Sequence, residues 1–340
     1  MKKFVLFLAF MAGSITLVFA WGAWGHQHIN RAAVFALPVE MRPFFYNHID
    51  FITEEAVVPD LRKYTINDRA EFPRHYIDLE LYNPQGDMTG LPSTMKDAKA
   101  RYPDSVLNKA GTLPWTILEV LDKLTAAFRS KKKTEILFLA GDLGHYIGDA
   151  HMPLHTALNH DGQLTGQKGI HALWEGQLPE TFGDGYNLFT GEARYITDPG
   201  RETRAMIDSS HRLVAQLLDA DKELSASMPR EKVYILDSSG HIVVNQYGDM
   251  VHAAGYVNMF HQRLAGMIEQ QLRGAIAETS AFWYTAWVNA GKPDLSDLDP
   301  PALTKRNRKD MDRDLRRWSQ GKVEMVKASG EFGKWVGTGR

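Results

Sequence analysis

Apolar residues recur every three or four positions along most of the chain, which is the pattern of helices with one buried face. Long helices are predicted where this pattern is sustained and where Pro or Gly ends it. These stretches are His26 to Leu37, Trp115 to Arg129, Lys132 to Ile147, Arg201 to Leu218, and Val251 to Val288, of which the last has room for two helices.

One stretch has a different pattern. Between Lys232 and Val244, two β-branched runs flank Asp-Ser-Ser-Gly, which predicts a β-hairpin. Asn83 to Tyr102 and His160 to Gly169 are rich in Pro and Gly and are predicted to be loops. The expected fold class is therefore mainly α, a single multi-helix domain with a small β-hairpin.

Residues 1–20 have the layout of a secretory signal peptide. Two lysines precede an apolar run over residues 4–11, and Ala20 supplies a small residue before the cleavage point. An anchoring helix is the alternative, but the apolar run is shorter than the roughly 20 residues that span a membrane. We therefore expect cleavage before Trp21 and export to the periplasm or the medium.

Composition adds two points. Cysteine is absent, so the core or bound metals must supply the stability that disulfides give many exported proteins. The net charge of −2 favours no class of partner, but residues 305–340 hold eleven Lys or Arg against five Asp or Glu. We interpret this end as a solvated, partly disordered tail, and a polyanion-binding arm is the alternative.

The strongest chemical signal is GDLGHYIGDAHMPLH. His145 and Asp149 are four residues apart, which places both on one face of a helix and within reach of one metal ion. Pro153 should end the helix, and His155 follows in the turn. A hydrogen-bonded polar helix end is the alternative, but histidine with carboxylate suits zinc.

GIHALWEG has the same spacing of histidine and carboxylate, because His171 and Glu175 are again four residues apart. PRHYIDLE adds His75 and Asp78, and VVPDLRK adds Asp60, although such residues alone are more often caps or surface pairs. Several groups of this kind in one chain favour a metal centre.

Trp21 would be the first residue after signal cleavage. Its freed α-amine would have a pKa of about 7.7–8.0, so that near neutral pH a metal displaces the proton readily. The amine and carbonyl of Trp21 could chelate an ion, with His26 closing the site from the first helix.

Together these residues resemble the zinc-dependent superfamily of S1/P1-type nucleases and bacterial phospholipases C. Its hallmarks are a mature N-terminal Trp, H-[FY]-I-D, H-[FY]-x-G-D-x-x-x-P-L-H and H-x-x-x-W-[DE]. The chain has Trp21, HYID at 75–78, HYIGDAHMPLH at 145–155 and HALWE at 171–175. The resemblance implies a phosphodiesterase domain of the phospholipase C/nuclease type over residues 21–298, followed by a basic tail at 299–340.

The resemblance also implies three Zn²⁺ ions. The first would be held by Asp60, His75, His145 and Asp149, the second by His155, His171 and Glu175, and the third by Trp21, His26 and the other oxygen of Asp149. Four further histidines have no counterpart role and are interpreted as ordinary polar residues: His28, His48, His151 and His160.

The chemistry implied is hydrolysis of a phosphoester by water. Zinc lowers the pKa of bound water towards about 7, so that attack on an anionic phosphodiester becomes possible near neutral pH. The catalytic candidates are Asp60 and Asp149, which would hold the ions, and Lys63. This lysine stands where the nucleases carry Arg or Lys near the scissile phosphate, and a surface lysine is the alternative.

The substrate divides the two branches of the superfamily. The short gap from Trp21 to His26 favours a nuclease. So do Tyr76, at the position of a ring that stacks on a base, and Asp78, at the position of a carboxylate that binds the base edge. A core tyrosine and a capping aspartate are the alternatives for these two residues.

Three features favour the phospholipases. The second group ends in Glu175 where nucleases usually have Asp, the interval from His155 to His171 is compact, and the disulfides of the nucleases are absent. We expect a nuclease or 3′-nucleotidase acting on single-stranded nucleic acid. A phospholipase C that cleaves phospholipid head groups is the alternative, and a non-catalytic secreted zinc-binding protein is a further one.

Overall fold

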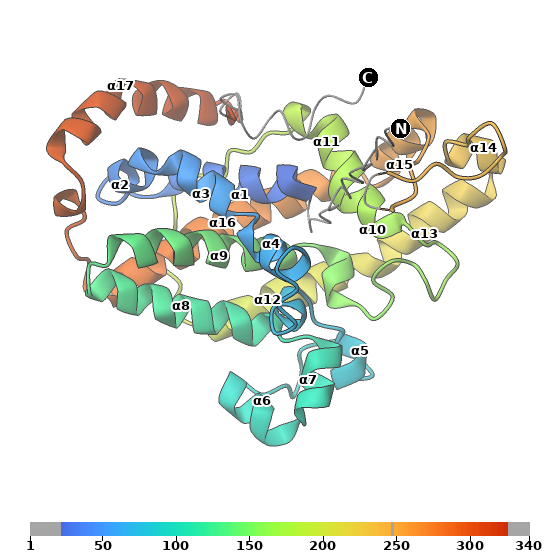
Figure 1. Ribbon diagram of the computed structural model, residues 1–340, viewed down its shortest axis with the longest axis horizontal. Helices are drawn as coiled ribbons and strands as arrows, with labels where there is room; N and C mark the ends of the chain where they lie inside the picture. The colour runs from blue at the N-terminus through green and yellow to red at the C-terminus, as the bar shows by residue number, and fades with distance from the viewer. Residues whose placement is uncertain (1–21, 246–247, 326–340) are drawn as a thin grey trace, which may run out of the picture.

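The structure is a computed structural model, and it describes residues 22–245 and 248–325. The expected signal peptide, Trp21 and the end of the basic tail lie outside the described residues. Where the structure describes the chain, helices dominate and no extended strand is formed, which confirms the mainly α fold class (Figure 1).

The α-helices follow one another as α1 (Gly22–Ala36), α2 (Arg42–Asn47), α3 (Ile49–Glu55), α4 (Val58–Tyr64), α5 (Leu79–Tyr82), α6 (Met95–Arg101), α7 (Asp104–Ala110), α8 (Leu113–Arg129), α9 (Lys133–Ala150), α10 (Ile170–Ala172), α11 (Leu178–Phe182), α12 (Pro199–His211), α13 (Leu213–Ala226), α14 (Arg230–Val233), α15 (Ala254–Arg263), α16 (Met267–Asn289) and α17 (Pro301–Trp318). Short helical turns are η1 (Phe72–His75), η2 (Pro153–Thr156), η3 (Leu173–Gln177), η4 (Gly183–Gly185) and η5 (Ser296–Leu298).

The core forms where α1, α8, α9 and α16 pack on one another. Large rings fill this space: Trp283 of α16 stacks on Phe45 with ring centroids 5.2 Å apart, and both are fully buried. The Trp283 indole nitrogen donates to the Ala140 carbonyl of α9 at 2.9 Å, so the one polar atom of the ring is satisfied.

Glycines allow α9 to approach its neighbours closely. A Cβ atom on Gly141 would lie 2.4 Å from Cγ of Glu55, and one on Gly144 would lie 1.9 Å from Oδ1 of Asn30. One on Gly148 would lie 3.0 Å from Nδ1 of His26. The glycines therefore bring α1 and α3 against the helix that carries His145 and Asp149.

Two predicted helical regions are each divided into two helices, and for the second of them this division was expected. The stretch from Arg201 to Leu218 is divided at Arg212 between α12 and α13, where Ser210 and His211 hydrogen-bond the carbonyls of Ala150 and Thr156. These long-range bonds leave no trace in the hydrophobic pattern. The long helical region ending at Val288 forms α15 and α16, separated by Ala265 and Gly266, both with positive φ.

The hairpin is present and one loop prediction is wrong in part. Antiparallel bridges join Leu236 to Ile242 and Val244 to Met250, so the chain turns twice, while Lys232 itself belongs to α14. The loop predicted at 83–102 contains α6. Thr94 caps this helix by accepting from the Asp97 amide at 3.1 Å, a capping signal that the count of Pro and Gly obscured.

The basic end differs most from its expectation. Residues 301–318, which we expected to lie in a solvated, partly disordered tail, form α17, and this helix packs on α2 and α1. Its Trp318 ring is buried, with its centroid 6.4 Å from that of Phe35. No helix among the residues described is both long enough and apolar enough to cross a membrane.

The close approach of α9 and α1 gives a test of the fold. Gly144→Ala should lower the free energy of unfolding by about 1–3 kcal/mol, because the added methyl overlaps the buried side chain of Asn30. Gly255→Ala is the matched control, since a Cβ there meets open space, and it should be neutral or stabilising by up to about 1 kcal/mol. Urea unfolding of the zinc-saturated proteins measures both, and equal effects would contradict this account of the packing.

Candidate metal centre

Several elements meet near the middle of the molecule and bring distant sequence motifs together. The C-terminal end of α9 meets the N-terminal half of α1, and α4, η1, η2 and the helical segment from α10 to η3 surround them (Figure 1). The predicted ligand side chains in the described residues all lie here. Each is buried except His171, which is partly exposed.

The first group consists of Asp60, His75, His145 and Asp149. Nδ1 of His75 lies 3.0 Å from Nε2 of His145 and 3.1 Å from Oδ2 of Asp149, and the last two atoms are 3.2 Å apart. Oδ1 of Asp60 is farther away, at 3.6 Å from His75 Nδ1 and 4.0 Å from His145 Nε2. All four donor atoms therefore face one small space.

These spacings fit a zinc ion. A tetrahedral Zn²⁺ with nitrogen and oxygen ligands has donor atoms separated by about 3.3 Å, given its bond lengths. The three contacts among His75, His145 and Asp149 lie near this value, while Asp60 would need a small inward shift. The donor set of two imidazoles and two carboxylates is one that zinc accepts.

The second group consists of His155, His171 and Glu175. Nε2 of His171 lies 3.3 Å from Nε2 of His155 and 3.0 Å from Oε2 of Glu175. The distance between Nε2 of His155 and Oε2 of Glu175 is 3.7 Å. His171 and Glu175 belong to one helical segment whose middle, η3, is wound as a π-helix. Such turns are frequent at functional sites. A three-ligand group leaves room for a fourth ligand such as water.

Asp149 joins the two groups. Its Oδ2 faces His75 and His145, while its Oδ1 lies 3.1 Å from Nδ1 of His155 and 3.6 Å from Nε2 of His26. A single carboxylate, fully buried, therefore contacts four imidazoles.

His26 gives an independent sign that a ligand is expected here. Its ring is fully buried and stacks on His145 with centroids 3.9 Å apart, yet neither ring nitrogen has a hydrogen-bond partner among the described residues. Burial, followed by the nearby His145, lowers the pKa of His26 well below its ordinary value, so the imidazole is neutral. A buried neutral imidazole with free nitrogens is costly unless water or a metal satisfies it.

Other contacts fix which ring nitrogen faces the centre. Nδ1 of His145 lies 2.8 Å from the Ala56 carbonyl, and Nδ1 of His171 lies 2.7 Å from the His160 carbonyl. Each Nδ1 therefore carries the proton and leaves Nε2 for a metal, the usual arrangement around metal-binding histidines.

His75 is oriented by a carboxylate that the sequence reasoning missed. Its Nε2 lies 3.4 Å from Oε1 of Glu71, and the same oxygen accepts a hydrogen bond from the Tyr146 hydroxyl. Arg62 and Arg74 also pair with Glu71, at 3.2 Å and 3.8 Å. The four-residue spacing from Glu71 to His75 was visible in the sequence and could have identified this partner.

Charge within the centre follows from these contacts. Burial alone would lower the pKa of His145 and His171, but the carboxylates beside them raise each pKa to about 9. Burial alone would raise the pKa of Asp149, but His145 and His155 hold it well below its ordinary value. Binding of a metal ion would therefore displace protons from these imidazoles.

Lys63 lies inside the centre rather than on the surface. The residue is 9% exposed, and its Nζ lies 3.8 Å from Oδ1 of Asp60 and 4.5 Å from the ring centroid of Tyr64. Burial lowers the pKa of Lys63, but Asp60 and Tyr64 outweigh that effect and hold it above its ordinary value. A permanently charged ammonium group thus lies beside the first group of ligands.

Tyr76 and Asp78 lie next to the second group, because the Ile77 amide between them donates to the His155 carbonyl at 2.8 Å. Tyr76 is half-buried, and its hydroxyl donates to backbone carbonyls at the end of α7. Asp78 is buried, and its burial, with the nearby Glu80, raises its pKa to about 7.

The other histidines lie in ordinary polar settings. Nδ1 of His28 lies 2.6 Å from the Trp24 carbonyl, Nδ1 of His151 lies 2.9 Å from the Ile147 carbonyl, and His48 pairs with Asp299 at 2.9 Å. His160 contributes its carbonyl to His171, as described above.

The predicted ligand Trp21 lies outside the described residues. Its neighbour Gly22, the first residue of α1, lies against the second group: a Cβ on Gly22 would be 3.5 Å from the Glu175 carbonyl oxygen. The described chain therefore begins at the edge of the centre.

Comparison with known proteins adds a family match to this geometry. A family model described as S1/P1 Nuclease matches residues 21–272. Nuclease S1 of Aspergillus oryzae is 24% identical over 189 residues, which are 51% of this chain and 59% of that protein. A probable serine protease of Bradyrhizobium tropiciagri is 24% identical over 218 residues, 60% of this chain and 26% of that protein.

The chain thus spans less than two thirds of the length of either relative. The family match nevertheless covers most of the chain and includes both groups of candidate ligands. The chain belongs to the S1/P1 nuclease family.

Proposed function

We propose that this protein is an exported, trinuclear-zinc phosphodiesterase that cleaves single-stranded nucleic acid and 3′-nucleotides. The single observation that carries the proposal is the position of Asp149, whose two oxygens face two separate sets of imidazoles. One carboxylate that faces two metal positions could hold two ions close together, as two-metal hydrolysis needs. Membership of a nuclease family supports nucleic acid as the substrate.

The residues that would hold the ions follow from the groups described. Asp60, His75, His145 and Asp149 would hold one ion, and His155, His171 and Glu175 a second. His26 and the Oδ1 atom of Asp149 would hold a third, together with Trp21. When bound, zinc supplies a Lewis acid that lowers the pKa of water towards about 7 and offsets phosphate charge.

The remaining side chains would bind and orient the substrate. The three carboxylates offset only half the charge of three Zn²⁺ ions, so the loaded centre attracts a phosphodiester. Lys63 would add a buried cation beside Asp60 and hold a non-bridging phosphate oxygen. Open positions for water separate this arrangement from a closed structural zinc site and favour catalysis over a purely structural role.

Tyr76 and Asp78 would select the substrate. Tyr76 lies beside the second group with a half-buried ring, and stacking on such a ring is worth about 1–3 kcal/mol per base. Asp78 would accept a hydrogen bond from the N–H groups of a base edge. Glu175, at a position where nucleases usually have Asp, keeps cleavage of phospholipid head groups as the second candidate.

One preparation tests the proposal directly. Protein that starts at Trp21 should contain about three zinc ions per chain and cleave single-stranded DNA, RNA and a 3′-nucleotide, but not phosphatidylcholine. EDTA should abolish cleavage before the protein unfolds. The same protein with extra residues before Trp21 should lose one zinc ion and most activity, because its α-amine is no longer a ligand.

Each alternative gives a different result. Cleavage of phosphatidylcholine alone would assign the protein to the phospholipases and return Tyr76 and Asp78 to structural roles. Full activity with extra residues before Trp21 would exclude the α-amine of Trp21 as a ligand of the third zinc ion. Three zinc ions per chain without hydrolysis of any substrate would leave the non-catalytic zinc-binding protein, and zinc well below three per chain would contradict the trinuclear centre itself.

Asp78 predicts a pH dependence. Its pKa of about 7 in the folded protein means that the carboxylate forms, and can accept from a base, only as the pH rises through that value. As the pH rises through about 7, KM for a 3′-nucleotide should therefore fall relative to KM for bis(p-nitrophenyl) phosphate, whose rings carry no N–H donors. The Asp78→Asn variant should lose this trend and raise the nucleotide KM about ten-fold. A trend that persists in the variant would remove Asp78 from base recognition.

Glu71 predicts an effect on metal affinity. Glu71→Gln keeps the side-chain shape but removes the charge that orients His75, so zinc affinity should fall by about 10–100-fold. Competition with a chromophoric chelator measures this, and Glu231→Gln on the exposed surface of α14 is the control. An unchanged affinity in Glu71→Gln would show that His75 needs no such support.

A further inference from the structure

The outward face of α17 carries a row of basic side chains without acidic partners. Five of them are exposed and form no ion pair within the part of the chain that the structure describes: Lys305, Arg306, Arg308, Lys309 and Arg316. Arg313 pairs with Asp310 and Asp314, and Arg317 pairs with Glu324. The positive charge of this helix is therefore neutralised only in part.

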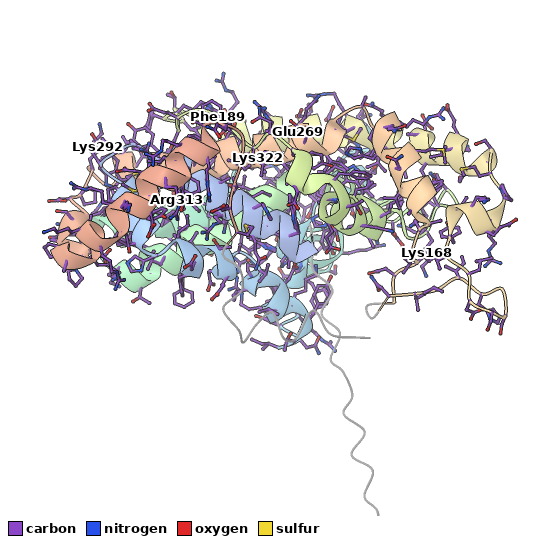
Figure 2. The ribbon with its side chains drawn as sticks, turned by 90° about the horizontal axis from the view of Figure 1, so that it is seen from above. Lys168, Phe189, Glu269, Lys292, Arg313 and Lys322 are labelled. Carbon is purple, nitrogen blue, oxygen red and sulfur yellow. The ribbon has the colours of Figure 1, made fainter. Side chains whose placement is uncertain are left out.

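Helical spacing aligns three of these charges. Lys305, Lys309 and Arg316 are separated by four and seven residues, which places them along one side of the helix, together with the exposed Asp312, so this side keeps a net charge of +2. At the rise of an α-helix, the row they form is about 16 Å long. Seen from above in Figure 2, α17 lies across the near surface of the molecule, with the labelled Arg313 on it.

The helix is held in place by its other face. The Tyr46 hydroxyl donates to Oδ2 of Asp314 at 2.7 Å, and the side-chain amide of Asn47 donates to the Thr304 hydroxyl at 2.9 Å. Trp318 packs against Phe189, with ring centroids 4.6 Å apart. The charges therefore sit on a fixed surface rather than on a flexible tail, and binding costs little ordering of the backbone.

The chain beyond α17 runs back towards the metal centre. Nε of Arg31 donates to the Glu324 carbonyl at 2.6 Å, and Nζ of Lys322 donates to the Asp184 carbonyl at 3.1 Å. Arg31 lies on α1, about 7 Å along the helix axis from His26. Helix α1 therefore contacts the segment that follows α17 and also carries His26 of the metal centre.

We propose that the outward face of α17 is a second binding surface, for the phosphate backbone of single-stranded nucleic acid, and that it retains long substrates beside the metal centre. The inference rests on the proposed function. A polymer with one negative charge per nucleotide complements a row in which three cations outnumber the single carboxylate of Asp312. The helix lies outside residues 21–272, so this surface is an addition to the part that matches the family.

An anionic membrane is the other polyanion to consider. Helices that bind membranes bury an apolar face in the lipid. In α17 that face is already occupied, because Met311 and Leu315 pack against the core and Trp318 is buried. Nucleic acid, which needs only the charged face, is the better fit.

Neutralising the row tests the inference on the zinc-loaded protein. The variant Lys305→Gln/Lys309→Gln/Arg316→Gln should raise KM for long single-stranded DNA and lower the slope of log KM against log salt by about 2. KM for a dinucleotide, which is too short to reach both surfaces, should stay unchanged. The control Lys222→Gln/Arg230→Gln/Lys232→Gln removes three exposed cations from α13 and α14 and should change neither value.

The outcomes separate this inference from the proposed function. An unchanged slope for long DNA, or an equal rise in the KM of the dinucleotide, would overturn the inference while cleavage continues. If the unaltered protein cleaves no nucleic acid, the proposed function fails, and fluorescence anisotropy with labelled long DNA still tests the surface in the same three proteins. Loss of binding to phosphatidylserine vesicles, with DNA binding intact, would assign the surface to membranes and overturn the proposal.

Discussion

Five imidazoles and three carboxylates converge on one region from which water is largely excluded, and most of the molecule is arranged to hold them there. Buried ionisable groups are costly unless they neutralise one another or bind a cation. Asp149 is partly compensated by the imidazoles around it, but His26 has no hydrogen bond to either nitrogen among the described residues. Such a cluster is therefore incomplete by itself, and its donor spacing is that of zinc ligands.

The same constraint explains the glycines of α9. A centre shared by α1 and α9 requires the two helices to approach more closely than ordinary side chains allow. Gly144 and Gly148 provide that approach, and His26 lies directly against Gly148 as a result. Helix propensity is given up at these positions, since glycine is a poor helix former, so the packing that positions the ligands outweighs the local preference of the chain.

The part of this architecture that could be predicted from sequence is the part encoded by short spacing. His145 with Asp149, and His171 with Glu175, follow from four-residue intervals on helices. Glu71 has the same interval to His75 but was overlooked, because its role depends on contacts with Tyr146 and Arg62 that come from elsewhere in the chain. The division of α12 from α13 likewise arises from long-range hydrogen bonds, which no local pattern encodes.

The basic end shows how composition can mislead when it is separated from periodicity. The excess of Lys and Arg suggested a solvated tail, yet Met311, Leu315 and Trp318 recur at helical spacing through the same residues and dock α17 on the domain. Docking of α17 on the domain lowers the entropic cost at which its basic side chains can bind a polyanion. A flexible basic tail would bind a polyanion only after paying the entropy of ordering, whereas a helix already fixed at both ends presents its cations in a set register. The charge and the fold of α17 therefore support one reading together that neither supports alone.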